Sequence, residues 1–370
     1  TSSICQGEQV NLLWPKILDY SHLNFAYRPF KWANSAAKNA GVWCTILGLE
    51  TQPRTKKLLF TENEVRECKN ISPYLIPGPN VIVEPRSSSI SQLSRMKMGS
   101  NPVEGKNLVL EASEARKILN EFPDSEKFIR QYGGTQELVS GVRRFCIWIE
   151  DEQVSEAMEI PPIRERVLAC RAYRESAGRD ARKAARRPHA FCYSTYEERD
   201  FVVVGNTIGN SLEFVPADLR PAGQVVNHAA FTIYGAPLVE FSLITSTAHR
   251  VWAETVAGRL GNGTRYGNTI VYNTFPVPTL TNKNKRDLIK CATDILLARE
   301  EYFPASIAEL YDPEEMPESL RAAHERNDEV VDRIYIGRVF RNDTERLEKL
   351  LELYTKMTSD ERASKGARAV

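Results

Sequence analysis

The segment from Phe25 to Glu50 reads FAYRPFKWANSAAKNAGVWCTILGLE. Its second half, GVWCTILGL from Gly41 to Leu49, is a dense run of apolar, β-forming residues, which predicts a buried strand. Before this segment, the residue pattern at 9–18 predicts a helix. After it, the polar, proline-containing QPRTKK at 52–57 predicts a boundary. We therefore expect the first 57 residues to form a small α/β unit.

In the rest of the chain, the expected secondary structure changes at Pro278 from short mixed elements to helices. From 58 to 278, short apolar runs alternate with prolines and glycines, which is typical of a mixed domain of short elements. After it, amphipathic stretches predict a helical domain over 279–357, and the polar tail 358–370 is expected to fray. We expect helices at 112–122, 125–132, 162–176, 237–257, 283–302, 317–335 and after the capping residue Asn342, and strands at 143–149, 189–194, 201–205, 211–215 and 224–233.

Composition narrows the class of protein. The 370 residues correspond to two or three domains. No apolar run approaches the ~18 residues that a membrane span needs, so no membrane partner is expected. Seven cysteines, none in a CxxC pair, favour buried free thiols in a reducing compartment over a zinc site or a disulfide set. We therefore expect a cytoplasmic protein without a metal.

Positive charge is concentrated in one segment, although the net charge is only +1. Residues 164–187 contain eight arginines and one lysine against three acidic residues, whereas 300–318 contains no basic residue. Such a surplus favours contact with phosphate groups, which position a protein on nucleic acid without reading its sequence. The alternative is a solvated face with local ion pairs. The candidate phosphate contacts are Arg164, Arg171, Arg174 and Arg182.

Motifs that carry catalysis are missing from the sequence. No glycine-rich turn between a strand and a helix is present to hold a nucleotide or a methyl donor. The Asn/Asp-Pro-Pro-aromatic tetrapeptide of adenine methyltransferases is also absent, and the nearest match is Ile160-Pro161-Pro162. The five histidines stand singly and are interpreted as structural. We expect no catalytic residues in this chain.

Short elements follow one another in a fixed order along nearly the whole chain: ISPYL (71–75), MGSNP (98–102), GVRRFCIWIED (141–151), the Arg-rich helix (163–178), PHAF (188–191), TSTAHRVW (245–252), GRL (258–260), RYG (265–267), YNTFPVP (272–278) and the segment 310–328. This series resembles the C-terminal part of MmeI-like single-chain restriction–modification proteins, which methylate adenine in a short DNA sequence; YEER (196–199) departs from the family pattern. The resemblance implies an α+β multidomain fold: the end of a Rossmann-like methyltransferase sheet (1–57), a mixed target recognition domain (58–278) and a C-terminal helical bundle (279–357).

The resemblance also implies partners and a cofactor. Double-stranded DNA is the expected partner, together with upstream methyltransferase, and in some members nuclease, domains of the same bacterial or archaeal polypeptide. S-adenosylmethionine would serve the intact parent and would not bind this part, which is expected to be a fragment without methyl transfer of its own. A stand-alone nucleic-acid-binding or scaffold protein without catalysis is the alternative.

Individual roles follow from the same resemblance. The glycine-rich loop GRLGNGTRYG (258–267) and the turn at 227–230 are expected to read bases, although Gly261 and Gly263 stand where larger reading side chains are usual. Phe30 and Trp32 would form the wall against which an extruded base is held, or would close the core of the methyltransferase sheet. The base-reading candidates are Asn262, Thr264, Arg265, Tyr266 and Ala229.

Overall fold

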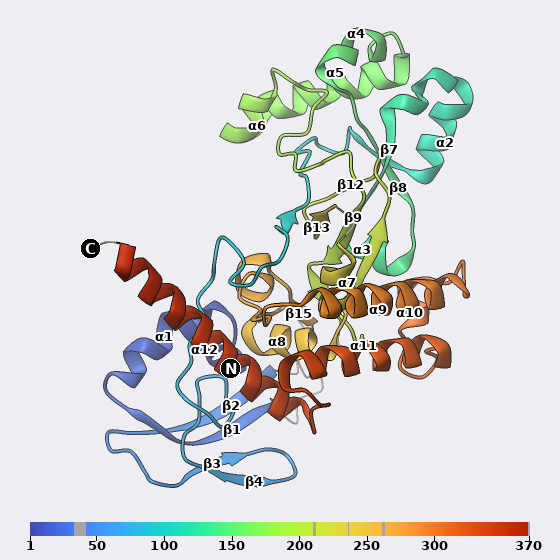
Figure 1. Cartoon of the computed structure of the whole chain (residues 1–370). Coiled ribbons are helices and arrows are strands. Elements are labelled where there is room, and N and C mark those ends of the chain that lie inside the picture. The colour runs from blue at the N-terminus through green and yellow to red at the C-terminus, as the bar shows by residue number, and fades with distance from the viewer. Residues whose placement is uncertain (33–41, 210–211, 236, 261–262, 369–370) are drawn as a thin grey trace.

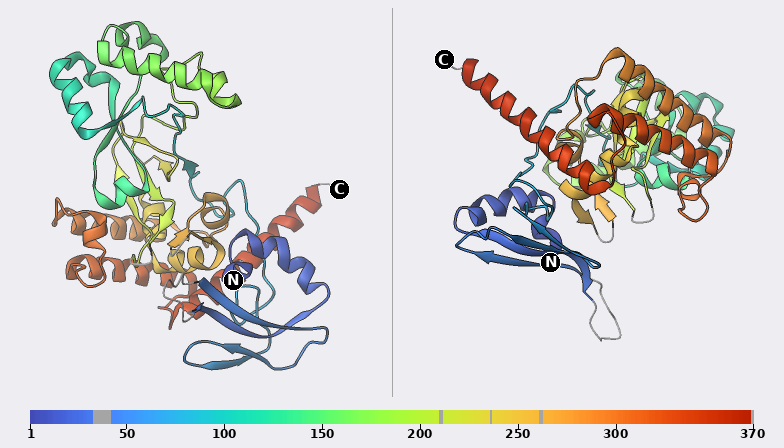
Figure 2. Two further views of the ribbon diagram at one scale, coloured as in Figure 1. Left: turned by 180° about the vertical axis from the view of Figure 1, so that it is seen from behind. Right: turned by 60° about the horizontal axis from the view of Figure 1, so that its bottom comes forward.

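The computed structural model describes residues 1–32, 42–209, 212–235, 237–260 and 263–368. Three tiers follow one another in space (Figure 1): an N-terminal sheet, a middle tier of helices and short strands, and an upper lobe. The views in Figure 2 show the same separation and place the C-terminal helix across the junction of the lower two tiers. The α+β multidomain fold expected from the sequence is confirmed.

The N-terminal tier is a four-stranded sheet with the order β2-β1-β3-β4. Its strands β1 and β2 are antiparallel, as are β3 and β4, whereas β1 and β3 run parallel. Helix α1 covers one face, and its Trp14 side chain is fully buried. The bounds are η1 (Ser2–Cys5), α1 (Glu8–Leu18), β1 (His22–Trp32), β2 (Val42–Glu50), β3 (Lys57–Phe60) and β4 (Val65–Cys68). The expected helix is confirmed. A strand forms at the apolar run, but the prediction that it is buried is wrong, because β2 stands at the sheet edge and Ile46 and Leu49 are exposed.

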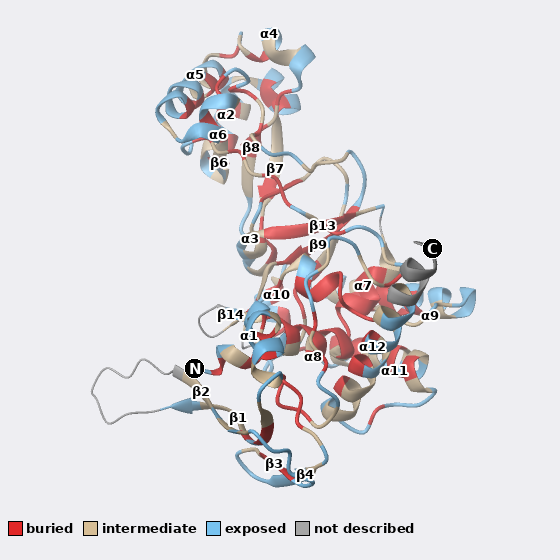
Figure 3. Cartoon of the chain, turned by 90° about the vertical axis from the view of Figure 1, so that its left-hand side faces the viewer, coloured by how far each residue is buried: buried red, intermediate tan, exposed pale blue. Residues whose placement is uncertain are grey.

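The upper lobe has a hydrophobic core of its own. Its sheet has the order β12-β7-β8-β6, and the helices α2, α5 and α6 pack around it. Exposed residues cover the outer sides of these helices (Figure 3). The bounds are β6 (Val109–Glu111), α2 (Ala112–Glu121), η2 (Pro123–Phe128), β7 (Ile129–Gly133), α3 (Thr135–Ser140), β8 (Arg144–Ile147), η3 (Asp151–Gln153), α4 (Val154–Ala157), α5 (Pro161–Ser176), α6 (Arg179–Ala184) and β12 (Val225–Val226).

The middle tier joins the sheet β11-β9-β13-β5 and the small sheet β10-β15-β14 to the C-terminal helices in one large core. Helix α9 packs between α7 and α11, and α12 lies against α8. The bounds are β5 (Lys97–Met98), β9 (Phe201–Gly205), β10 (Thr207–Ile208), β11 (Ala217–Arg220), β13 (Ala230–Tyr234), α7 (Leu238–Ile244), α8 (Thr247–Val256), β14 (Gly258–Leu260), β15 (Gly263–Arg265), η4 (Asn268–Tyr272), α9 (Asn282–Glu300), α10 (Ile307–Leu310), α11 (Glu318–Ile336) and α12 (Asp343–Arg368).

Five sequence predictions of local structure are wrong. The helix at 125–132 is a 3₁₀ turn followed by β7, because its β-forming half pairs with β8. The strand at 189–194 is irregular apart from one bridge, and the strand placed at 211–215 begins at Ala217 instead. The helix at 237–257 is broken in two, since the Ser246 side chain accepts a hydrogen bond from His249 N and caps α8. The helical backbone of α12 continues to Arg368, through most of the tail expected to fray.

Candidate nucleic-acid interface

The expected base-reading loop is a β-hairpin of β14 and β15, and β15 also pairs with β10. Successive side chains of a strand point to opposite faces, so only every second residue faces outward. Arg265 is exposed, whereas Thr264 is 6% exposed and Tyr266 is 2% exposed. Thr264 and Tyr266 were therefore assigned wrongly as base-reading side chains. Asn262 lies outside the described residues.

Tyr266 has a structural role instead. Its hydroxyl lies 2.8 Å from Nε2 of His249 in a hydrogen bond that is fully buried. Burial raises the pKa of Tyr266 well above its ordinary value and lowers the pKa of His249 to about 3. Both groups are therefore neutral near pH 7 and anchor the hairpin to α8.

The turn that contains Ala229 lies beside this hairpin through two residues that the sequence did not single out. The backbone N–H of Tyr266 donates to the carbonyl of Asn206 (2.9 Å), and Asn206 N donates to Thr135 Oγ1 (2.8 Å). The Thr135 hydroxyl in turn donates to the carbonyl of Ala229. Ala229 itself is half-buried. Arg265 and Ala229, which are distant in sequence, thus belong to one surface region.

A close backbone approach fixes the same turn. The Asn227 side chain lies against Gly134, where an added Cβ would stand 2.1 Å from Asn227 Oδ1. Asn227 Oδ1 also accepts a hydrogen bond from Ala229 N (2.8 Å). Gly134 therefore leaves room for the side chain that shapes the turn, a requirement that no sequence motif revealed.

Arg174 was assigned wrongly as a phosphate contact. Its side chain is fully buried, and its five N–H groups donate to five backbone carbonyls from three segments of the upper lobe. Helical spacing put Arg174 on the same side as the exposed arginines, but that side of α5 packs against the segment after α6 and the loop before β6. The carbonyls are those of Val103 (3.0 Å), Ala184 (3.0 Å), Arg187 (2.9 Å), Pro102 (2.6 Å) and Ala190 (2.8 Å).

The remaining phosphate candidates, Arg164, Arg171 and Arg182, are exposed. Three other arginines of the segment are in ion pairs, Arg166 with Glu114, Arg179 with Asp180 and Arg187 with Asp151. Part of the positive surplus is therefore neutralised. Within the described chain, no acidic partner is found for the side chains of an exposed basic surface on α5, α6 and the turn that follows, made of Arg164, Arg171, Arg182, Lys183 and Arg186.

The two aromatic candidates of the N-terminal sheet differ in environment. Phe30 lines a cleft of about 840 Å³ between this sheet, α8 and the start of α12, together with Tyr27 and Trp43. Its ring meets that of Tyr27 edge-on at 5.3 Å, and Arg259 lies 5.3 Å from the Trp43 ring centroid. Trp32 is 56% exposed at the end of β1, so it belongs to no core of the described chain. Aromatic surface is available for a base, as the wall hypothesis requires.

The described residues contain no cluster of three or more His, Cys, Asp or Glu side chains placed to hold a metal ion. No helix among them is long and apolar enough to cross a membrane. The site residues described above therefore form polar surfaces, around Arg265 and on α5 and α6, and an aromatic surface in the cleft lined by Phe30.

Comparison with known proteins assigns these regions. Residues 1–61 match the DNA-methyltransferase domain of MmeI, 77–279 its target recognition domain and 280–361 its C-terminal domain. The class is thus that of proteins that carry a target recognition domain next to the end of a DNA-methyltransferase domain. The chain belongs to the MmeI family, and its role is recognition associated with a DNA methyltransferase.

Two relatives show the extent of the similarity. DNA methyltransferase A of Bacillus subtilis (strain 168) is 34% identical over 97% of this chain and 41% of its own length. The structure of the type IIL restriction–modification enzyme MmeI in complex with DNA superimposes with a TM-score of 0.87 at 33% identity, over 97% of this chain and 49% of that one. The chain therefore spans about half, or less, of the length of these relatives.

Proposed function

We propose that this chain is the sequence-specific DNA recognition module of an S-adenosylmethionine-dependent, adenine-specific DNA methyltransferase that acts in the cytoplasm of a bacterium or archaeon. The observation that carries the proposal is the surface shared by Arg265 and Ala229, within the region that matches a target recognition domain. An exposed guanidinium on a hairpin can donate two hydrogen bonds to a guanine edge, which discriminates by ~1–3 kcal/mol. The exposed basic surface of the upper lobe supplies non-specific attraction to phosphate.

The proposal is tested by selecting duplexes from a random DNA pool with the purified chain. One short enriched motif is expected. Arg265→Ala should relax one position of that motif, whereas Thr264→Val, at the buried neighbouring position, should leave the motif unchanged. The absence of an enriched motif together with equal or tighter RNA binding would instead favour a stand-alone RNA-binding or scaffold protein.

We propose that the methyl donor binds outside the described part of the chain. Strand β1 leads into the antiparallel strand β2, and the Gly133-Gly134 turn that leads from β7 into α3 is occupied by the Asn227 side chain, which leaves no room there for a donor. The residues present do not fit S-adenosylmethionine, so we assign methyl transfer to the remainder of a longer methyltransferase and derive no step of it here.

One face of the N-terminal sheet supports such a covalently linked partner. The face opposite α1 is apolar and open to solvent, with Ile46 48% exposed and Leu58 40% exposed. Strand β2 stands at the sheet edge, where backbone groups are free to pair with a further strand. We propose that the upstream part of the methyltransferase domain covers this face and edge.

A further inference from the structure

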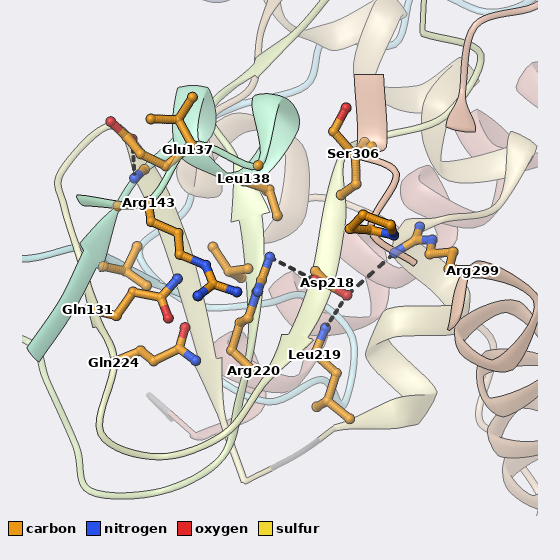
Figure 4. A pocket seen from close by; sticks show the side chains of 18 of the residues that line it. Gln131, Glu137, Leu138, Arg143, Asp218, Leu219, Arg220, Gln224, Arg299 and Ser306 are labelled. Atoms are coloured by element: carbon orange, nitrogen blue, oxygen red, sulfur yellow. Dashed lines mark hydrogen bonds and ion pairs between the residues drawn. The ribbon is translucent and has the colours of Figure 1, made fainter. Parts of the chain in front are cut away.

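A second pocket, of about 690 Å³, lies between strands β11 and β12 and the segment that joins α9 to α10 (Figure 4). None of the residues assigned above to DNA contacts lines it. Its volume lies within the roughly 300–1,000 Å³ of small-molecule sites. Apolar side chains cover part of the wall on both sides, among them Leu138, Leu219, Leu296 and Phe303.

Polar side chains without protein partners converge at one end of this pocket. Figure 4 shows the guanidinium of Arg143 beside that of Arg220, with the carboxamides of Gln131 and Gln224 directed toward the same space. Within the described residues, the side chains of Arg143, Gln131 and Gln224 have no hydrogen bond or ion pair to protein. Polar groups gathered in this way in a concave site have hydrogen-bonding capacity to offer a ligand.

The charge at this end is positive. Arg220 Nη2 lies 2.9 Å from Asp218 Oδ2, and Arg299 Nη1 lies 3.6 Å from Oδ1 of the same carboxylate. One negative charge therefore balances only one of these two positive guanidinium groups. Glu137 accepts a hydrogen bond from Gly134 N and pairs with Arg144 outside the pocket. The third acid of the lining, Glu300, belongs to the opposite wall on α9.

We propose that this pocket binds a phosphate monoester of mononucleotide size. Two guanidinium groups and two carboxamides offer more donors than the two oxygens of a carboxylate accept, whereas a phosphate group presents three oxygens. The phosphate lies between Arg143 and Arg220, and the body of the ligand contacts Leu219 and Phe303. The pocket adjoins the turn at 227–230 through Gly134, but none of the base-reading candidates lines it, so the proposal does not depend on which DNA sequence is read.

Calorimetric titration of the full chain with AMP and with inorganic phosphate tests the site. We expect AMP to bind more tightly than phosphate, and Arg143→Gln to weaken AMP binding about tenfold or more through the loss of a charge-assisted hydrogen bond. Arg116→Gln, an exposed change on α2 outside the pocket, is the matched control and should have no effect. Thermal unfolding of both variants verifies that they fold.

Three results would overturn the proposal: no saturable AMP binding, equal effects of the two variants, or benzoate binding as tightly as AMP. Displacement of AMP by duplex DNA would also overturn it, since the pocket would then be part of the DNA surface. Selection from the random duplex pool separates this proposal from the function proposed above, because Arg143→Gln should leave the enriched motif unchanged.

Discussion

At the scale of single residues, Arg174 shows how one arginine in a basic segment can be structural. Its buried guanidinium donates to five backbone carbonyls, so a shorter or apolar side chain leaves them without these donors. We predict that Arg174→Met lowers the free energy of unfolding by about 3–5 kcal/mol. Urea unfolding measures the loss. Arg171→Met, on the exposed side of the same helix, should change stability by less than about 0.5 kcal/mol, and a similar loss in both variants would contradict the assignment.

The buried His249 makes stability depend on pH. Burial lowers the pKa of its imidazole to about 3, whereas the unfolded chain titrates near 6.5. The unfolded state therefore binds the proton first, and stability that is complete above pH 6.5 is lost as pH falls toward 3. The expected loss from this residue is about 1.4 kcal/mol per pH unit below 6.

The contribution of His249 is isolated by comparing the chain with His249→Gln in urea at pH 7 and pH 5. Other titrating groups act in both proteins, including Asp328, whose pKa burial raises to about 6. The variant should lose less stability between the two pH values than the unsubstituted chain. An identical pH dependence would show that His249 is not a buried neutral imidazole.

At the scale of elements, α5 and α6 carry the exposed basic surface away from the middle tier (Figure 1). Each phosphate contact removed should reduce the dependence of DNA affinity on salt, measured as log K against log salt concentration, by about 0.9. We predict that replacing Arg171, Arg182 and Arg186 together by glutamine reduces the slope by about 3. Fluorescence anisotropy with a duplex at several salt concentrations measures it.

A matched triple variant on α9 provides the control. Lys285, Arg286 and Lys290 are also exposed but belong to α9 in the middle tier, away from the exposed basic surface. Their replacement by glutamine should leave the slope unchanged. If both triple variants reduce it equally, DNA is attracted by net charge alone and the upper lobe has no special contact.

At the scale of the whole molecule, the open face and edge of the N-terminal sheet determine how the isolated chain behaves. Exposed apolar edge strands pair with other chains. We predict that the chain self-associates at high concentration and that Ile46→Lys, which places a charge on the open face, suppresses this. Sedimentation velocity over a range of concentrations measures the effect. A chain that stays monomeric throughout would show that this face needs no partner.

Much of the backbone could be predicted because the signals are local. The helix that ends before Pro123 and the helix α5, which begins with proline, depend on neighbours in sequence, and both predictions are confirmed. The apolar run at β2 forms a strand as predicted, but its burial was predicted wrongly, because burial depends on what packs against the strand. The helix predicted at 125–132 is wrong because the second half of this segment pairs with β8, the next strand along the chain, and a helical pattern within the segment does not reveal that pairing. The break before α8 was missed because Ser246 acts through a single capping bond.

The sequence by itself determined the family, the order of the three regions and the basic segment, because ordered motifs and local charge are properties of the chain. Only the tertiary structure decided which side chains of those motifs are exposed and can contact DNA. The alternation of a strand buries Thr264 and Tyr266 and exposes Arg265, and the packing of α5 buries Arg174 beside exposed arginines. Burial depends on what packs against a residue, and the contacts that place Ala229 beside the hairpin join segments more than 60 residues apart.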